Sequence, residues 1–265
     1  MNRRLEQAQA CVGQGVAAID TPALVIDLDA MERNLARMAA FAAGRGLRLR
    51  PHAKMHKSAE LAKRQVAHGA VGVCVQKTDE ALALAHAGVH DIFISNEVIA
   101  PAKLARLAAA VRDLPTRFGI AVDSALGITR LAQALDAAGV HAPNAIDVFI
   151  EIDVGQGRCG VAPGEAAVPL ARQIAQHPAL RFAGLQAYHG SAQHQRTPAE
   201  RRIAIEGATQ AVVRSREALA AAGFSVPLVT GAGTGSFVLE AASGVWDELQ
   251  AGSYLFMDAD YAGNQ

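Results

Sequence analysis

The sequence contains few cysteines, and their spacing gives them no structural role. Cys11, Cys74 and Cys159 are odd in number and widely separated, so they match neither a disulfide framework nor a zinc-ligand pattern. Reduced thiols are typical of intracellular proteins. We therefore expect a soluble, cytoplasmic protein.

The chain also lacks net charge and any long apolar run. Lys and Arg together number 25, as do Asp and Glu, so the charge balance does not favour nucleic acid or an anionic membrane as a partner. No run approaches the roughly 18 apolar residues that span a bilayer. The first residues, "MNRRLEQAQACVGQG", lack the apolar centre of a signal peptide.

What the chain does have is a repeating order of short apolar runs and longer helical patterns. Hydrophobic residues make up 51% of its 265 residues, which is enough for a large core. Eight such runs, separated by stretches with apolar residues three and four positions apart, predict a (β/α)8 TIM-type barrel of the α/β class rather than an open doubly wound sheet. The predicted strands are 23–28, 47–50, 71–75, 91–95, 118–122, 146–152, 182–188 and 227–231.

In such barrels the chemistry occurs where the strands end at their carboxyl termini. Polar residues follow most of the predicted strands and should meet at one rim of the barrel. They are Lys54, Gln76, Asn96, Asp123, Asp153, Arg158, Tyr188, His189 and the turn "TGAGTGS" at 230–236.

Lys54 lies in "RPHAKMHKS", directly after the second predicted strand. Most lysines are solvated, but a lysine in a desolvated barrel mouth can hold a neutral, nucleophilic amine. Lys57 competes for this role, although it should lie in the next helix and point outward. His52 and His56 have a spacing that suits a metal on a helix. They span a strand end and a loop, however, so packing near the site is the better interpretation for His52.

The turn "TGAGTGS" is rich in glycine and can present backbone N–H groups to an anion such as phosphate, or it can be a flexible loop. Arg158 in "EIDVGQGRCG" can pair with an anionic oxygen or with a carboxylate. Tyr188 can pack on a planar ligand, and His194 can move protons, although single histidines are more often structural.

Seven motifs together resemble a known family. They are "TPALVIDLDAMERNL", "RPHAKMHKS", "ISNEV", "EIDVGQGRCGV", "LQAYHGSAQH", "TGAGTGS" and "ELQAGSYLFMDADY". The chain resembles the D-threonine aldolase and 3-hydroxy-D-aspartate aldolase family, whose members are pyridoxal-phosphate enzymes of fold type III with an alanine-racemase-like barrel. The resemblance implies a domain over residues 21–265, preceded by an extension over residues 1–20.

The resemblance also implies the roles of individual residues. Lys54 would bind pyridoxal 5'-phosphate covalently, Arg158 would lie near its phenolic oxygen and Tyr188 beside its ring. His194 matches a histidine that assists proton transfer. The remaining matched positions line the cofactor or bind its phosphate: Gln76, Thr234, Gly235, Gly252, Ser253 and Tyr261.

The implied reaction is the cleavage of a β-hydroxy-D-amino acid, a small molecule, to glycine and an aldehyde. The family is homodimeric and uses a divalent metal of the Mn, Mg or Co type. Its metal ligands lie in a C-terminal β-domain that is absent from this chain, so we assign no metal ligand here. The chain therefore resembles a fragment or a truncated form.

Three other functions stay open. A related D-serine dehydratase would eliminate the hydroxyl group and release ammonia. A cofactor-free aldolase would use Lys54 directly on a sugar phosphate, and a non-catalytic barrel would only bind the cofactor. One departure from the family is Ala232, which replaces the usual glycine in "TGAGTGS". We expect a negative φ there, since a methyl group disfavours a positive one.

Overall fold

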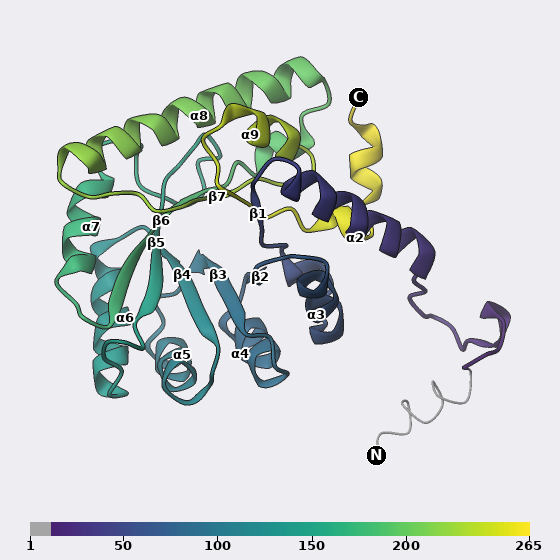
Figure 1. Ribbon diagram of the computed structural model, residues 1–265, viewed down its shortest axis with the longest axis horizontal. Coiled ribbons are helices and arrows are strands. Elements are labelled where there is room, and N and C mark those ends of the chain that lie inside the picture. Colours follow the sequence, from purple (N-terminus) through teal and green to yellow (C-terminus); the bar gives the residue numbers. More distant parts are fainter. Residues whose placement is uncertain (1–11) are drawn as a thin grey trace.

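The computed structural model describes residues 12–265 and contains a barrel of eight parallel strands (Figure 1), which confirms the predicted fold class. The sheet order is β1-β8-β7-β6-β5-β4-β3-β2. The barrel closes between β1 and β2, where His52 and Cys74 form a parallel bridge. The strands are β1 (Arg48–Leu49), β2 (Val73–Val75), β3 (Asp91–Glu97), β4 (Arg117–Val122), β5 (Ile146–Glu151), β6 (Leu180–Ala187), β7 (Val229–Gly231) and β8 (Glu248–Leu249).

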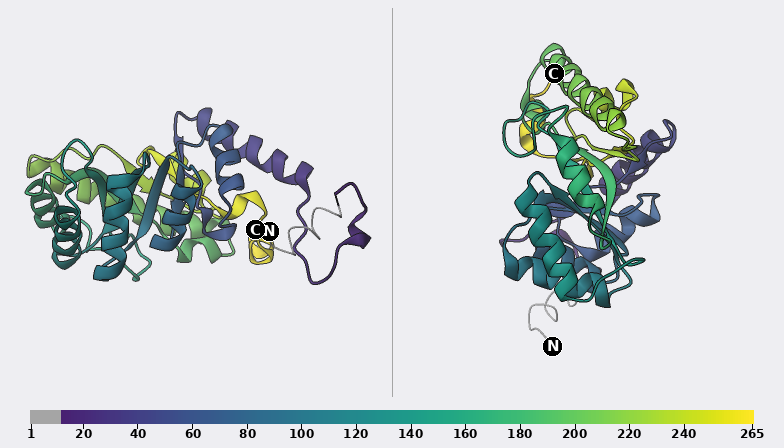
Figure 2. Two further views of the ribbon diagram at one scale, coloured as in Figure 1. Left: turned by 90° about the horizontal axis from the view of Figure 1, so that it is seen from below. Right: turned by 90° about the vertical axis from the view of Figure 1, so that its left-hand side faces the viewer.

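Helices alternate with the strands and surround them (Figures 1 and 2). Several begin at side-chain caps; Asp27, Ser58 and Thr197 each accept a backbone N–H of the first turn. The α-helices are α2 (Leu28–Ala43), α3 (Ala59–Ala67), α4 (Thr78–His86), α5 (Pro101–Asp113), α6 (Ala125–Ala137), α7 (Ala167–Ala175), α8 (Pro198–Ala221) and α9 (Phe237–Ser243). Short 3₁₀ helices are η1 (Val16–Ala18), η2 (Ala53–Met55), η3 (Ser191–His194), η4 (Ser253–Leu255) and η5 (Ala259–Gly263).

The first predicted strand, residues 23–28, is wrong. This segment is irregular up to Asp27, and α2 begins at Leu28. Leu24 is fully exposed, and Val25 and Ile26 are also exposed. Apolar residues alone do not make a strand, because the backbone also needs a neighbouring strand. Within residues 12–265 no strand pairs with this segment. None of the helices described is long and apolar enough to cross a membrane.

A strand that the sequence did not predict completes the barrel. β8 has two residues and pairs with both neighbours through Glu248, opposite Arg48 on β1 and Thr230 on β7. A two-residue strand containing a buried acid shows no apolar run. The predicted number of eight strands is therefore right, but the second to eighth predicted strands correspond to β1 to β7. Lys54 follows β1, and the glycine-rich turn follows β7 rather than the last strand.

Aromatic side chains fill the middle of the barrel. The rings of Phe93 on β3 and Phe149 on β5 lie 4.7 Å apart between centroids. Gly119 on β4, which lies between these strands, makes room for them, since a Cβ there would approach the Phe93 ring to 3.1 Å. The barrel is thus packed rather than hollow at this level.

Ion pairs line a second cavity at the opposite end of the barrel, where the strands begin. Asp147 is buried and accepts the Nε–H of Arg181 at 2.5 Å. Arg50, also buried, pairs with Asp91 at 2.5 Å and with Glu248 at 2.9 Å. These charges are paired with one another, whereas the chemistry of such barrels occurs at the carboxyl ends of the strands.

Candidate active site at the barrel mouth

A cavity of about 530 Å³, including its open mouth, lies at the carboxyl ends of the strands. Eight of the ten predicted site residues line it, and Gly235 and His194 do not. The lining consists of His52, Lys54, Met55, Gln76, Ser95, Arg158, Gln186, Tyr188, Gly233, Thr234, Gln250, Gly252, Ser253 and Tyr261. The amine predicted to react and the glycine-rich turn therefore share one cavity.

The two lysines that follow β1 lie in different surroundings. Lys54 lies in η2 and lines the cavity. The side chain of Lys57 is 61% exposed, and its Nζ lies 3.5 Å from Glu80. The Lys57 ammonium also donates a hydrogen bond to the carbonyl of Lys54. Only Lys54 lines the space where a ligand would bind.

The surroundings of Lys54 favour a neutral amine. Burial in the cavity lowers its pKa below the ordinary value, and the positive charge of Arg158 lowers it further. Lys54 is nevertheless exposed to solvent at the mouth of the cavity. A neutral primary amine is the nucleophilic form, so this position suits covalent attachment to a carbonyl compound.

His52 supports the turn that carries Lys54. Its Nδ1 accepts the backbone N–H of Lys54 at 3.2 Å, and its Nε2 lies 3.1 Å from the hydroxyl of Ser95. Burial and the nearby charge of Lys54 hold the pKa of His52 well below its ordinary value. The ring is therefore neutral, with its proton on Nε2 donated to Ser95, whose hydroxyl donates to the Val75 carbonyl at 3.4 Å.

The Tyr188 ring lies near both basic side chains of the cavity. The Nζ of Lys54 is 5.8 Å from the centre of the Tyr188 ring, and the guanidinium carbon of Arg158 is 5.9 Å from it. Burial, together with the nearby Tyr261, raises the pKa of Tyr188 to about 12. Tyr188 therefore remains a neutral phenol, which suits packing against a planar ligand.

The remaining wall is rich in hydroxyl groups and lacks side-chain bulk. Thr234 accepts the backbone N–H of Tyr254 at 3.0 Å. Burial raises the pKa of Tyr261, and side-chain hydrogen bonds with Ser253 and Thr234 partly offset this rise. A Cβ at Gly252 would lie 2.7 Å from the carbonyl oxygen of His52. Hydroxyl groups around a small space fit a phosphate group.

Gln193 is a buried residue that organises the glycine-rich turn and that the sequence did not single out. Its Oε1 accepts the backbone N–H of Gly235 at 2.7 Å, and its Nε2 donates to Ser236 at 2.6 Å and to the His189 carbonyl at 3.2 Å. The N–H of Gly235 is already used, so Gly235 supports the turn from behind the cavity. Ser236 in turn donates to Glu240 at 2.7 Å.

The expected negative φ at Ala232 is wrong. Ala232 has φ of 70°, in the left-handed region, and is 1% exposed. The turn requires this backbone conformation whether or not the residue is glycine. The methyl group is tolerated at a cost of about 1–2 kcal/mol, while its burial among Leu249, Ala251 and Tyr254 is favourable.

His194 lies next to the cavity rather than in its lining. Its side chain is 59% exposed, and Nδ1 lies 2.5 Å from Asp260. Asp260 also pairs with Arg196 at 2.5 Å, and these partners lower the pKa of Asp260 to about 2. The His194 ring stacks near Tyr261, with centroids 6.1 Å apart. His194 is thus separated from the cavity by Tyr261.

Three polar lining residues were missed by the sequence reasoning. Gln186 and Gln250 exchange hydrogen bonds of 3.2 and 2.7 Å across β6 and β8, and Ser95 lies inside the barrel on β3. The signal was a single polar residue inside an apolar strand, "FAGLQAY" for Gln186 and "DIFIS" for Ser95. A buried polar residue in such a run faces either the interior or a ligand.

Fold and cavity together define a barrel protein with a lysine, an aromatic ring and several hydroxyl groups lining one mouth. The chain belongs to the family of the alanine racemase N-terminal domain, which residues 26–260 match. It is 47% identical to a D-threonine aldolase from Arthrobacter sp over 96% of this chain and 65% of the relative. It is 43% identical to a 3-hydroxy-D-aspartate aldolase from Paracoccus denitrificans (strain Pd 1222) over 95% of this chain and 64% of the relative.

Solved structures show the same similarity. The D-threonine aldolase from Filomicrobium marinum matches with a TM-score of 0.90 and 49% identity over 94% of this chain and 66% of that one. D-threo-3-hydroxyaspartate dehydratase from Delftia sp. HT23 matches with a TM-score of 0.83 and 32% identity over 92% of this chain and 63% of that one. The chain therefore spans about two thirds of the length of these relatives.

Proposed function

We propose that this barrel binds pyridoxal 5'-phosphate through Lys54 and that the complete protein cleaves β-hydroxy-D-amino acids to glycine and an aldehyde. The observation that carries the proposal is the shared cavity of Lys54, Tyr188 and the turn at Thr234. The aldolases similar to this chain carry D-threonine and 3-hydroxy-D-aspartate in their names.

The cavity fits the cofactor at both ends. The hydroxyls of Thr234, Ser253 and Tyr261 surround the small space beside Gly252 and would hold the phosphate. At the other end, the lowered pKa of Lys54 increases the share of neutral amine available for covalent attachment. When bound, pyridoxal 5'-phosphate supplies an electron sink for the carbanion that forms as a Cα–Cβ bond breaks.

The protein's own residues would orient the cofactor and exclude competing chemistry. The Tyr188 ring offers a flat face on which the cofactor can pack. Arg158, whose guanidinium carbon lies 5.9 Å from the centre of the Tyr188 ring, would donate to the phenolic oxygen of the cofactor. The neutral His52 keeps the backbone of Lys54 fixed through the hydrogen bond to Nδ1. Gln76 lines the cavity beside Lys54 and offers a neutral amide to the ligand.

Proton transfer at the β-hydroxyl requires a base near the open side of the cavity. We assign assistance in this step to His194, whose imidazole is exposed and lies beside Tyr261. Its contact with Asp260 would stabilise the protonated ring after the transfer.

The family resemblance adds a homodimer and a divalent metal whose ligands lie in the part of the relatives beyond this match. The free thiols of Cys74 and Cys159 fit a reducing compartment such as the cytoplasm.

A dehydratase is the second candidate, since a D-threo-3-hydroxyaspartate dehydratase is 35% identical to this chain. The products separate the two reactions. The protein translated from its complete reading frame is incubated with D-threonine and with D-serine, and glycine with aldehyde is assayed against keto acid with ammonia. Glycine and acetaldehyde from D-threonine support the proposal. A keto acid as the main product would contradict it.

The state of the purified protein separates the remaining possibilities. Absence of pyridoxal 5'-phosphate from the purified protein by mass spectrometry would favour an aldolase that uses Lys54 without a cofactor. Cofactor bound to the complete protein, with no turnover of any D-amino acid tested, would favour a binding role.

A further inference from the structure

We propose that Glu97, Glu151 and Cys159 form a binding site for a divalent transition-metal ion of the zinc type at the barrel mouth. This site consists only of residues of the barrel. It is separate from the metal ligands that the family resemblance places beyond residue 265. It also shares no residue with the cavity lining.

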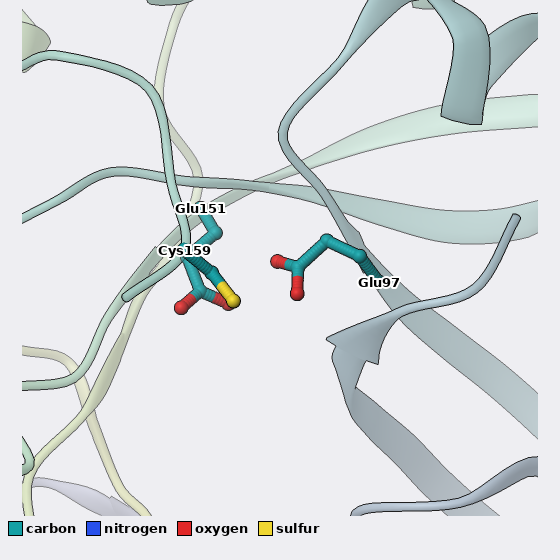
Figure 3. Close-up of side chains that lie close together, drawn as sticks. All are labelled: Glu97, Glu151 and Cys159. Carbon is teal, nitrogen blue, oxygen red and sulfur yellow. The ribbon is translucent and has the colours of Figure 1, made fainter. Parts of the chain in front are cut away.

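Two parts of the chain, the end of β3 and the end of β5 with the loop after it, bring these ligands together. Glu97 ends β3, Glu151 ends β5, and Cys159 lies in the loop that follows β5. The candidate ligand atoms all lie within 4.8 Å of one another. Figure 3 shows the two carboxylates and the thiol pointing toward a common space. Small side-chain rotations would bring them to the roughly 2.0–2.3 Å at which zinc binds oxygen and sulfur.

Buried acceptor atoms without partners point to a missing ligand. Glu151 is 3% exposed. Its Oε1 lies 3.7 Å from Arg158, whereas its Oε2 has no hydrogen-bond partner among residues 12–265. The Oε1 of Glu97 is also buried without such a partner in the described part of the chain. Carboxylate oxygens can only accept hydrogen bonds, so two that face each other need a cation or a proton between them.

Acidic groups outnumber basic ones around the cluster, which favours a cation. Asp123 adds its negative charge next to Glu151, and Arg158 adds a positive one. Three carboxyl groups therefore lie against one guanidinium. Asp123 itself is occupied by the backbone N–H of Gly160 at 3.2 Å, so it would act through its charge.

The donor types select the class of metal. A thiolate beside two carboxylates does not suit Ca²⁺ or Mg²⁺, which prefer six or more oxygen ligands. Zinc accepts both oxygen and sulfur in a four-coordinate site, with a water or another group in the fourth position. A bound metal would link β3 to the loop that contains Cys159. Because Arg158 is the neighbouring residue, the metal would also fix the guanidinium that lines the cavity.

Cobalt provides a direct test, since Co²⁺ replaces Zn²⁺ and its spectrum reports thiolate ligands. The chain with its cofactor is titrated with Co²⁺, and difference spectra are recorded. We expect one ion per chain, with a near-ultraviolet thiolate-to-cobalt band and visible bands of a four-coordinate ion. Zn²⁺ should displace the Co²⁺ and remove these bands.

Variants locate the site. In Cys159→Ser the thiolate band should disappear, whereas in the matched control Cys74→Ala, which removes the other described cysteine, it should persist. Glu97→Gln should weaken binding by roughly ten-fold or more. Circular dichroism checks that each variant is folded.

Two results would overturn the proposal. They are the absence of any thiolate band in the unmodified chain, and a band that is equally strong in Cys159→Ser. In the first case, an infrared band of a protonated carboxyl group that is lost in Glu151→Gln would show that a shared proton occupies the space. Neither result bears on cofactor binding by Lys54, so failure here is distinguishable from failure of the proposed function.

Discussion

The amine of Lys54 and the ring of Tyr188 lie on one cavity, with Nζ 5.8 Å from the ring centre. Arg158 lies at almost the same distance from the same ring, so two cationic groups share one aromatic face. The aromatic face attracts both cations, while each disfavours the charge of the other. This arrangement makes the protonation of Lys54 sensitive to Arg158.

Removal of the Arg158 charge should therefore raise the pKa of Lys54. Arg158→Met keeps an unbranched side chain but removes the positive charge that lowers this pKa. We expect covalent attachment of pyridoxal 5'-phosphate to cofactor-free protein to require a higher pH in the variant. The rate of attachment as a function of pH measures this shift. An unchanged profile would show that Arg158 does not act on the amine.

His52 should make the protein less stable in acid. Its pKa in the folded protein is well below the ordinary value because it is buried, whereas the unfolded residue binds a proton below about pH 6.5. The unfolding free energy should therefore fall as the pH drops below that value, by up to about 1.4 kcal/mol per pH unit. In His52→Gln this part of the slope should vanish, while the contributions of His56 and His189, whose pKa values are also lowered, remain.

Urea denaturation at pH 7, 6 and 5 provides the measurement for His52. Equal slopes for the unmodified chain and for His52→Gln over this range would contradict the assignment of a neutral, buried ring.

Glu240, in contrast to His52, should make the protein more stable in acid than at neutral pH. Burial raises its pKa to about 7, so the folded protein binds a proton that the unfolded chain releases above about pH 4.5. This contribution is complete below pH 4.5 and is lost as the pH rises to 7. Glu240→Gln should keep the hydrogen bond from Ser236 and gain stability relative to the unmodified chain as the pH rises. A gain of up to a few kcal/mol is expected at pH 8, and a difference independent of pH would contradict this prediction.

The left-handed backbone at Ala232 should make glycine unusually acceptable there. Ala232→Gly removes a strain of about 1–2 kcal/mol but also removes a buried methyl group. Ala132→Gly in the middle of α6 is the matched control, since Ala132 is equally buried at 1% exposure but helical. We expect the loss of unfolding free energy to be smaller at Ala232 by about 1–2 kcal/mol. Equal losses in chemical denaturation would show that the turn does not strain the alanine.

Local patterns in the sequence predicted most of the barrel, whereas eight of the cavity-lining residues were named by these patterns and the family resemblance together. Apolar runs, caps and glycines depend on neighbours in the chain, so they identified the strand ends where Lys54, Arg158 and Tyr188 lie. The segment 23–28 and the strand β8 were mispredicted because strand formation depends on a partner elsewhere in the chain. β8 is fixed by its pairing with β1 and β7, not by its own two residues.

The polar interior was harder to predict for the same reason. Glu97 reaches Glu151 after a change of register between Ile94 and Glu97, which no periodic pattern reveals. Gln193 supports Gly235 from 42 residues away. Such contacts depend on the closed barrel, so a single sequence gives the residue types but not their pairing.

The central claim is that Lys54, and not its neighbour Lys57, holds the cofactor. The most direct measurement is the mass of the borohydride-treated protein, because reduction makes the link between lysine and cofactor permanent. The unmodified chain and Lys57→Ala should each carry one cofactor, located by peptide mapping at residue 54, and Lys54→Ala should carry none. A cofactor found at residue 57, or retained covalently in Lys54→Ala, would contradict the account.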